Sequence, residues 1–480
     1  MAYVLRRRDE ATALAALESG EYEAIATSGQ SVADELVHLC VELGVFEALK
    51  CIRVQRERQG IPDELLLRTV AVLPFVEALG LSSAAGEIFK DAAILLQLGY
   101  AIREVQEGFN RRHNGACGEG KRARPCHVEV LREELTRVEL ESLAEFGRQC
   151  VKELFKRKLV KGKVCAIDGS GLHKHHRVVG LLSVYKGQPL WLSWRVLKGK
   201  ESEKGQEAKV VRSLVQEVME LGGSEAIEWL LMDALYADGP LLAWLEHGCG
   251  IHALVRLPED RLLYEDMQGL AQHGLSEWQT HTDVRYLSGH KQARQVAVSL
   301  IEGLESWDSF LDSAKQYGVE HPSLCGVLIR SVDRAAPTKV EEWALVSTKP
   351  LNSAWGAYSL WRNRWLIENS GFRELKEAWH LEAAPWSHTD ERVVAARVTF
   401  TLVAHNVAQI AKTTAGRKLT DRGIRRLHRQ LRAAYGVAPV IVFADNAFGI
   451  FHIEQIMAVA GLAPKYSLRP KPVTGSPPLS

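Results

Sequence analysis

The stretch VCAID, residues 164–168, ends a short apolar run on an aspartate, and WLLMD, residues 229–233, does the same further along the chain. Each run has the length and apolar character of a strand that is buried on both faces of a sheet. An acid at the carboxyl end of such a strand is held rigidly at the sheet rim and is open to a ligand. We therefore expect Asp168 and Asp233 to be functional side chains at a sheet rim.

A third acid, Glu368, lies in WRNRWLIEN, residues 361–369, a stretch predicted to be helical. Two acids on neighbouring strands and one on a helix packed across them can bind a pair of divalent ions. Such ions, roughly 3.5–4 Å apart, clamp the attacking and leaving oxygens of a phosphodiester. Carboxylates are hard oxygen ligands, which suit Mg²⁺ and Mn²⁺. Asp168, Asp233 and Glu368 are thus the predicted catalytic residues and metal ligands.

Three segments carry a family resemblance: Asp168–Ser170, Asp233–Asp238 and Arg364–Glu368, the last continued by Phe372–Lys376. They resemble the catalytic segments of DDE transposases, and most closely those of insertion-sequence family four, whose third motif has Tyr, Arg, Glu and Lys along one helix. The resemblance covers roughly residues 160–410. It implies that Arg364 and Lys376 contact DNA phosphate. The alternative for the third segment is an amphipathic helix packed by its tryptophans.

The third segment departs from the family motif at two positions. Trp361 stands where the family has Tyr, and Lys376 follows Glu368 with seven intervening residues, where the family has six. On an ideal helix this extra residue rotates Lys376 roughly 80° away from Glu368 and gives Leu375 the aligned position. A one-residue π-bulge at residues 370–371 would restore the shared face.

The resemblance predicts a DNA transposase of a bacterial insertion sequence. Such an enzyme binds terminal inverted repeats in double-stranded DNA and catalyses metal-dependent strand cleavage and strand transfer, with two Mg²⁺ or Mn²⁺ ions. Synapsis of two element ends implies at least a dimer. Two alternatives remain open: a domesticated or inactive relative that binds DNA without cutting it, and a ribonuclease-H-like nuclease without strand transfer.

The order of elements predicts an α+β multidomain protein. Its catalytic core is expected to be ribonuclease-H-like, a mixed five-stranded sheet with helices in which the first and fourth strands are neighbours, as the fold implies. The predicted domains are a helical N-terminal domain with a helix–turn–helix joint at 79–85, two core parts, a β-rich insertion between them, and a basic C-terminal segment with a disordered tail. The N-terminal domain is predicted at 1–157, the two core parts at 158–256 and 341–412, the insertion at 257–340, and the C-terminal segment at 413–480.

The composition says more about the cellular compartment of the protein than about its binding partner. No apolar run in the 480 residues reaches the roughly 18 residues of a membrane span, and the N-terminus lacks a signal-peptide core, so we expect a cytoplasmic protein with no membrane partner. Eight scattered cysteines favour reduced thiols over a disulfide framework. The net charge of +1 does not by itself indicate a nucleic-acid binder.

Basic residues are nevertheless clustered. Eight cations lie between Lys412 and Arg432 with a single acid among them, and Arg425, Arg426 and Arg429 of this run are predicted to contact the DNA backbone. A second basic cluster spans residues 111–124. The alternative for both clusters is a solvated surface.

Four further sets of residues have competing interpretations. Two could form zinc sites. His173 with His175 and His176 has no evident fourth ligand, and its alternative is a solvated turn or a DNA contact. His113 with Cys117, Cys126 and His127 has an order and spacing that fit no standard zinc finger. Asp238 could replace Asp233 or cap the helix that follows it. Trp278 and Trp307 could stack on an unpaired base or pack in a core.

Overall fold

The computed structural model describes residues 3–459 and residue 461, except for 29–30, 57–59, 77–79, 82–86, 110–125, 173–174, 185–187, 204, 288–289, 334–335, 383–389 and 415–438. Contacts divide the chain into two compact units. Unit 1 combines Met1–Leu159 with Arg373–Ser480, and unit 2 is Val160–Phe372. The protein is of mixed α+β class, and each unit contains a mixed sheet.

Unit 2 is built on a nine-stranded sheet with the order β5-β4-β3-β6-β7-β11-β10-β9-β8. The strands are β3 (Val164–Leu172), β4 (His176–Ser183), β5 (Leu190–Lys198), β6 (Trp229–Met232), β7 (His252–Leu257), β8 (Trp278–Leu287), β9 (His290–Leu304), β10 (Leu324–Asp333) and β11 (Ala336–Ser347). Strands β3, β6 and β7 are parallel neighbours, and the other pairings are antiparallel. The two apolar runs at 164–168 and 229–233 therefore do form strands, β3 and β6, and these are parallel neighbours, as expected of the first and fourth strands.

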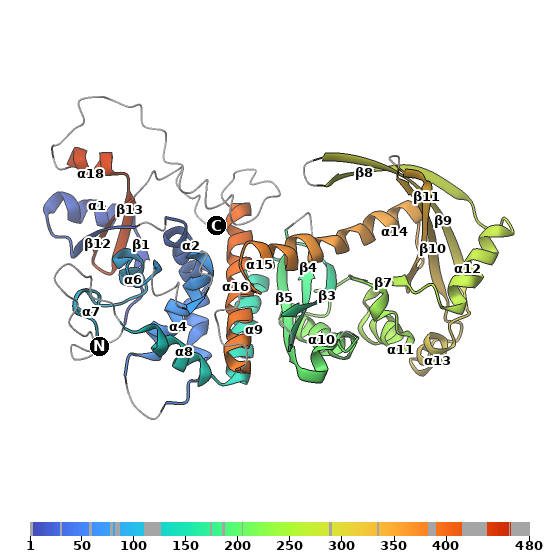
Figure 1. The fold of residues 1–480 in the computed structure, drawn as a ribbon, viewed down its shortest axis with the longest axis horizontal. Helices are drawn as coiled ribbons and strands as arrows, with labels where there is room; N and C mark the ends of the chain where they lie inside the picture. The colour runs from blue at the N-terminus through green and yellow to red at the C-terminus, as the bar shows by residue number, and fades with distance from the viewer. Residues whose placement is uncertain are drawn as a thin grey trace. The chain divides into compact units, whose positions relative to one another are not determined.

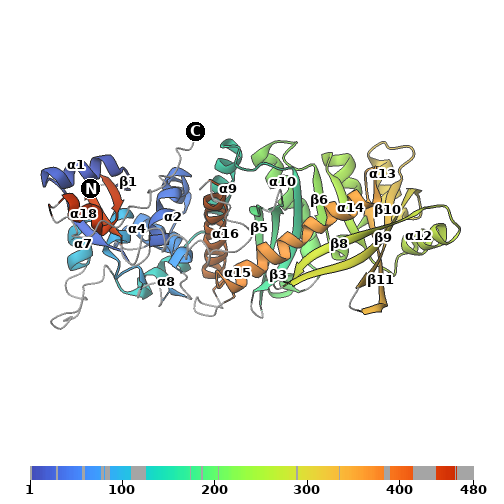
Figure 2. The ribbon, with the colours of Figure 1, turned by 90° about the horizontal axis from the view of Figure 1, so that it is seen from above.

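Helices lie on both faces of this sheet. Figure 1 shows α14 on one face and α10 and α11 on the other, and Figure 2 shows α14 crossing over the strands. The helices are α10 (Val211–Gly222), α11 (Gly239–Ala243), α12 (Leu262–Gln272), α13 (Asp308–Gln316) and α14 (Ala354–Trp361). Short helical segments are η4 (Gly199–Ser202), η5 (Glu207–Val210), η6 (Ala234–Tyr236), η7 (Trp244–Gly248), η8 (Arg362–Arg364) and the π-helical η9 (Ile367–Arg373).

The predicted β-rich insertion, 257–340, is not a separate sheet. Its strands β8, β9 and β10 continue the core sheet, because β11 pairs with both β10 and β7. Residues Leu254–Leu257 of β7 pair directly with residues Ala344–Ser347 of β11. A hydrophobic pattern shows that strands are present but not which edge they extend, so the sequence could not show this continuity.

Unit 1 corrects the predicted helical N-terminal domain. Strands β1 and β2 near the N-terminus form a four-stranded sheet with β12 and β13 near the C-terminus, in the order β1-β13-β12-β2. These strands are β1 (Arg7–Arg8), β2 (Ala24–Thr27), β12 (Val440–Ala444) and β13 (Ala447–Phe451). The segment predicted as a basic C-terminal region, 413–480, therefore supplies the centre of a sheet. Strands of two and four residues carry too little periodicity to be recognised from sequence.

Successive side chains of β12 point to opposite faces of this small sheet. Val442 and Phe451 pack with Ala13 of α1 (Glu10–Ser19), and Ile441 and Phe443 pack with α6 (Ala92–Gln97). In Figure 1 the red C-terminal hairpin accordingly lies beside the blue N-terminal helix α1. Both ends of the chain are thus needed for one core.

Unit 1 also contains one long apolar helix, α16 (Glu391–Thr414), on which α2 (Ser31–Glu42), α4 (Asp63–Val72), η2 (Leu73–Val76), α8 (Val128–Thr136) and α9 (Leu140–Lys156) pack. Its other helical segments are α3 (Val45–Ala48), η1 (Leu49–Cys51), α7 (Ile102–Glu107), α15 (Glu374–Glu377) and α18 (Ile453–Val459). Phe400 of α16 packs against Phe146 of α9, with ring centroids 5.3 Å apart. The prediction that the core continues through residue 412 is wrong for α16, because this helix packs within unit 1.

Among the described residues, α16 is the one helix long and apolar enough to cross a membrane. However, 94% of its apolar window is buried inside the protein, as in the core helix of a soluble protein. Its apolar character is explained by packing.

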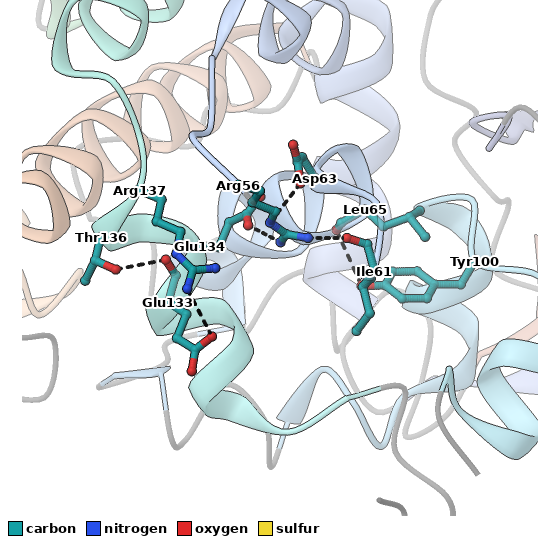
Figure 3. Close-up of polar contacts among 9 residues, drawn as sticks. All are labelled: Arg56, Ile61, Asp63, Leu65, Tyr100, Glu133, Glu134, Thr136 and Arg137. Atoms are coloured by element: carbon teal, nitrogen blue, oxygen red, sulfur yellow. Dashed lines mark hydrogen bonds and ion pairs between the residues drawn. The ribbon is translucent and has the colours of Figure 1, made fainter. Parts of the chain in front are cut away.

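Arg56 forms a partly buried ion cluster in unit 1 (Figure 3). Its guanidinium donates to the carbonyl oxygen of Ile61 at 2.6 Å and pairs with Asp63 at 3.0 Å and with Glu134. The Glu134 side chain is fully buried, and burial raises its pKa to about 7 although Arg56 opposes the shift. This cluster ties the segment before α4 to α8.

Candidate active site

Asp168 lies within β3 rather than at its end. The strand continues through Gly169, Ser170 and Gly171 to Leu172, paired with β4 on one side. The predicted strand end is therefore wrong. The apolar run stops at Asp168 because the last β3–β6 pair is Ala166 with Leu231, so one flank of β3 is unpaired beyond that point.

Asp233 follows directly on β6 and begins the turn η6. Its Oδ1 accepts a hydrogen bond from the backbone N–H of Ala234 at 2.8 Å. The parallel register pairs Ala166 with Leu231, and extending it by two residues on each strand places Asp168 level with Asp233. The sheet thus brings the two predicted acids to the same rim.

Asp238 has a structural role. Its side chain accepts from the backbone N–H of Leu241 at 2.9 Å and caps the start of α11. This contact matches the capping alternative for Asp238, and the extended register places Asp233, not Asp238, level with Asp168.

Arg364 bridges two of the three predicted acids. Its Nη2 donates to Oε1 of Glu368 at 2.5 Å, and its Nη1 lies 3.4 Å from Oδ2 of Asp168. The arginine is only 4% exposed, whereas the side chain of Glu368 is 41% exposed. The third segment therefore meets the rim of the sheet, with its arginine buried and its glutamate partly exposed.

A π-helix lies at the position where a π-bulge would restore the shared face of the family motif. η9 spans Ile367–Arg373 and includes Ser370 and Gly371. A Cβ on Gly371 would lie 3.1 Å from the ring of Trp191, and Phe372 packs on the same ring at 4.9 Å between centroids. The absence of a side chain at position 371 therefore permits the close approach of this helix to β5. The predicted π-bulge is confirmed.

Trp361, which replaces the family's tyrosine, connects the helix to β6. Its indole N–H donates to the carbonyl oxygen of Met232 at 3.3 Å, directly before Asp233. The guanidinium of Arg364 lies over the same indole, 5.2 Å from the ring centroid. Trp361 thus contacts both Arg364 and the backbone of the residue before Asp233.

The electrostatics show that these groups act on one another. Burial raises the pKa of Asp168 to about 6, and the carboxylates of Glu368 and Asp233 add to the increase. The backbone N–H of Gly169 and the charge of Arg364 oppose it. A buried carboxylate that is repelled by two others favours a nearby cation.

Two neighbouring residues were not singled out from the sequence. Tyr236 on η6 is completely buried, and its hydroxyl has no hydrogen-bond partner among the described residues. Asp168, Asp233 and Glu207 all raise the pKa of this hydroxyl, after burial. Glu207 is paired with Arg177 at 2.7 Å and lies against Gly169. Tyr236 stood inside the quoted segment 233–238, but nothing in the sequence gave it a role.

The donor chemistry fits a hard divalent ion: three carboxylates, with a buried unpaired hydroxyl beside them. The donors are not gathered around one point, since within the described residues no group of three or more His, Cys, Asp or Glu side chains is placed to hold a metal ion. Arg364 lies between Asp168 and Glu368 instead.

Several predicted site residues lie elsewhere. Lys376 is in α15 of unit 1, where it pairs with Glu382. Arg425, Arg426 and Arg429 fall outside the described residues, as do the basic cluster at 111–124 and most of the predicted helix–turn–helix joint.

The zinc alternatives gain no support. His175 is exposed and His176 is buried, while His173 falls outside the described residues. His127 accepts from the backbone N–H of Glu129 at 3.3 Å, as the cap of α8. Its predicted partners His113 and Cys117 also fall outside.

The two tryptophans of the β-rich region differ. Trp307 is 7% exposed and belongs to the core of unit 2. Trp278 is half-buried, with the guanidinium of Arg330 over its ring at 4.2 Å from the centroid.

Neither a protein-family profile nor a curated protein matches the chain.

Proposed function

We propose that unit 2 is the catalytic core of a DNA transposase with a ribonuclease-H-like fold. The observation that carries the proposal is that one sheet rim and Arg364 bring three acids from distant parts of the chain close enough for their charges to interact. Asp168 and Asp233 are level on neighbouring parallel strands, and Arg364 links Asp168 to Glu368 on the helix that crosses them. The strand order β5-β4-β3-β6-β7, three antiparallel strands and then two parallel ones, supports the fold assignment.

In this proposal Asp168, Asp233 and Glu368 hold two Mg²⁺ or Mn²⁺ ions. Bound there, the ions would supply nucleophile activation and charge neutralisation at a phosphodiester. Arg364 provides a positive charge for phosphate oxygens, and Trp361 positions both Arg364 and the end of β6. The unit would cleave a strand at the element end and use the freed 3′-hydroxyl for strand transfer.

The remaining parts of the proposal concern partners. Double-stranded DNA is the substrate, and a dimer brings two element ends together in a synaptic complex. The basic run from Lys412 to Arg432 is proposed to add affinity for the DNA backbone. A cytoplasmic location agrees with the burial of the apolar helix α16.

The test is incubation of the full-length protein with DNA that carries candidate end sequences, in Mg²⁺. Cutting followed by joining would support the transposase. Cutting alone would indicate a nuclease, and binding alone an inactive relative. Asp233→Asn should eliminate cutting, while the matched control Asp238→Asn removes a carboxylate that caps α11 and should retain it.

A further inference from the structure

Arg364 occupies the space between two carboxylates that the proposed function assigns to metal ions. One guanidinium nitrogen lies 2.5 Å from Oε1 of Glu368 and another lies 3.4 Å from Oδ2 of Asp168. These are oxygens that a divalent ion would need as ligands. With Arg364 in this position the cation of the site is a side chain of the protein itself.

The contacts of Arg364 allow its guanidinium to exchange the two carboxylates for another anion. Within the described residues they run to the carboxylates of Asp168 and Glu368 and to the ring of Trp361, and its Nε has no hydrogen-bond partner there. The Glu368 side chain is 41% exposed, so an incoming anion can approach Arg364 from the side of this residue. A phosphate offers guanidinium the same bidentate oxygen geometry as a carboxylate.

We propose that Arg364 is a placeholder cation that couples metal binding to DNA binding. Without DNA it neutralises Asp168 and Glu368 and keeps divalent ions out. When DNA is bound, a backbone phosphate takes over the guanidinium, and the two carboxylates become available to metal. This inference rests on the proposed function. It adds that the site is loaded with metal only in the presence of DNA, so the free protein is protected from metal-dependent cleavage chemistry.

The coupling has a thermodynamic consequence. If DNA raises the affinity for metal by some factor, metal must raise the affinity for DNA by the same factor. Removing the guanidinium should uncouple the two, because the carboxylates are then available at all times. Arg364→Gln should therefore bind metal more tightly than the wild type in the absence of DNA, although it no longer binds the substrate phosphate through a guanidinium.

The experiment measures Mn²⁺ binding to the full-length protein by electron paramagnetic resonance, with and without a mixed-sequence DNA duplex. For the wild type we expect weak binding without DNA and binding at least ~10-fold tighter with it, within the usual range of coupling between sites. For Arg364→Gln we expect tight binding in both conditions. Arg330→Gln, which removes the same charge from a surface pair with Glu342 in unit 2, should behave as the wild type.

Other outcomes separate this inference from the proposed function. Wild-type affinity that does not change with DNA, or Arg364→Gln affinity that is unchanged or weaker, overturns the placeholder role. Should Arg364→Gln fold poorly, Arg364→Lys gives the second test: its compact ammonium cannot bridge both carboxylates, so its affinity without DNA should lie above that of the wild type. Adding Asp168→Asn to Arg364→Gln should remove the gain. If it does not, or if no form binds Mn²⁺, the proposed metal site itself fails.

Discussion

Two arginines, one in each unit, lie between carboxylates but differ in what surrounds them. Arg56 in unit 1 also donates to the carbonyl oxygen of Ile61, and its partner Glu134 is fully buried, although its other partner Asp63 is 43% exposed. Arg364 in unit 2 bridges Asp168 and Glu368, whose side chains are 22% and 41% exposed. We call the first cluster closed, because it contains a backbone carbonyl and a fully buried carboxylate, and the second open, because solvent reaches both of its carboxylates. The same chemistry therefore serves structure in one unit and, in our proposal, function in the other.

The largest expected effect is on the open cluster. Asp168→Asn, Asp233→Asn and Glu368→Gln should each lower DNA strand cleavage on the order of 10³-fold or more, because each amide keeps the shape but removes the charge that holds metal. Folding and DNA binding should be nearly unchanged. Cleavage is measured on labelled DNA, with circular dichroism as the control for folding. Near wild-type cleavage by any one variant would remove that residue from the ligand set.

Metal removal should affect the function of the Arg364 cluster and leave the Arg56 cluster unaffected. Cleavage should require Mg²⁺ or Mn²⁺ and fail in Ca²⁺, which takes more ligands at longer distances. The closed Arg56 cluster involves no metal in our account, so chelation should leave the unfolding transition of the protein unchanged. Cleavage that persists in excess chelator would contradict the metal-dependent mechanism.

Breaking the closed cluster should cost stability instead of activity. Arg56→Gln at pH 8 leaves the buried Glu134 charge without its partner and should lower the free energy of unfolding by about 3–5 kcal/mol. Arg364→Gln should cost less, because water reaches Glu368. Urea unfolding of both variants measures the difference. Equal losses of unfolding free energy would contradict the difference in burial between Glu134 and Glu368 on which this prediction depends.

A pH titration sharpens the same comparison. Burial raises the pKa of Glu134 from 4.5 to about 7, so the folded state binds this proton more tightly than the unfolded state. The free energy of unfolding should therefore fall as pH rises from about 4.5 to about 7, on the order of 3 kcal/mol from this group. Asp34, whose pKa burial raises to about 8, contributes in the same direction. Glu134→Gln should flatten the profile over this range; an unaltered profile would mean that Glu134 titrates normally.

The smallest expected effect concerns charges away from both clusters. Replacing Arg425, Arg426 and Arg429 with Ala should weaken specific and non-specific DNA binding alike. The salt slope of log K should fall by roughly 0.9 for each phosphate that the variant no longer neutralises. A salt titration of the triple variant measures this slope. An unchanged slope would identify the run as a solvated surface.

Much of the site could be predicted because it depends on local patterns. Short apolar runs that end on acids located β3 and β6, and the extra residue between Glu368 and Lys376 pointed to residues 370–371 as a possible π-bulge, which lies within the π-helix 367–373. The roles of Tyr236 and Glu207 could not be predicted, because a single buried polar residue has no periodicity. Their importance comes only from lying beside Asp168 in space.

The sequence by itself determined where the longer strands and helices of unit 2 lie and which acids belong to them, since side-chain periodicity and spacing are local properties. Only the tertiary structure decided which edges meet. It joined β1 and β2 to β12 and β13 across most of the chain, and it extended the core sheet through β11 into the insertion. It also placed Arg364 between Asp168 and Glu368. Each of these results depends on the burial of surfaces that are distant in the chain, and no local pattern encodes that choice.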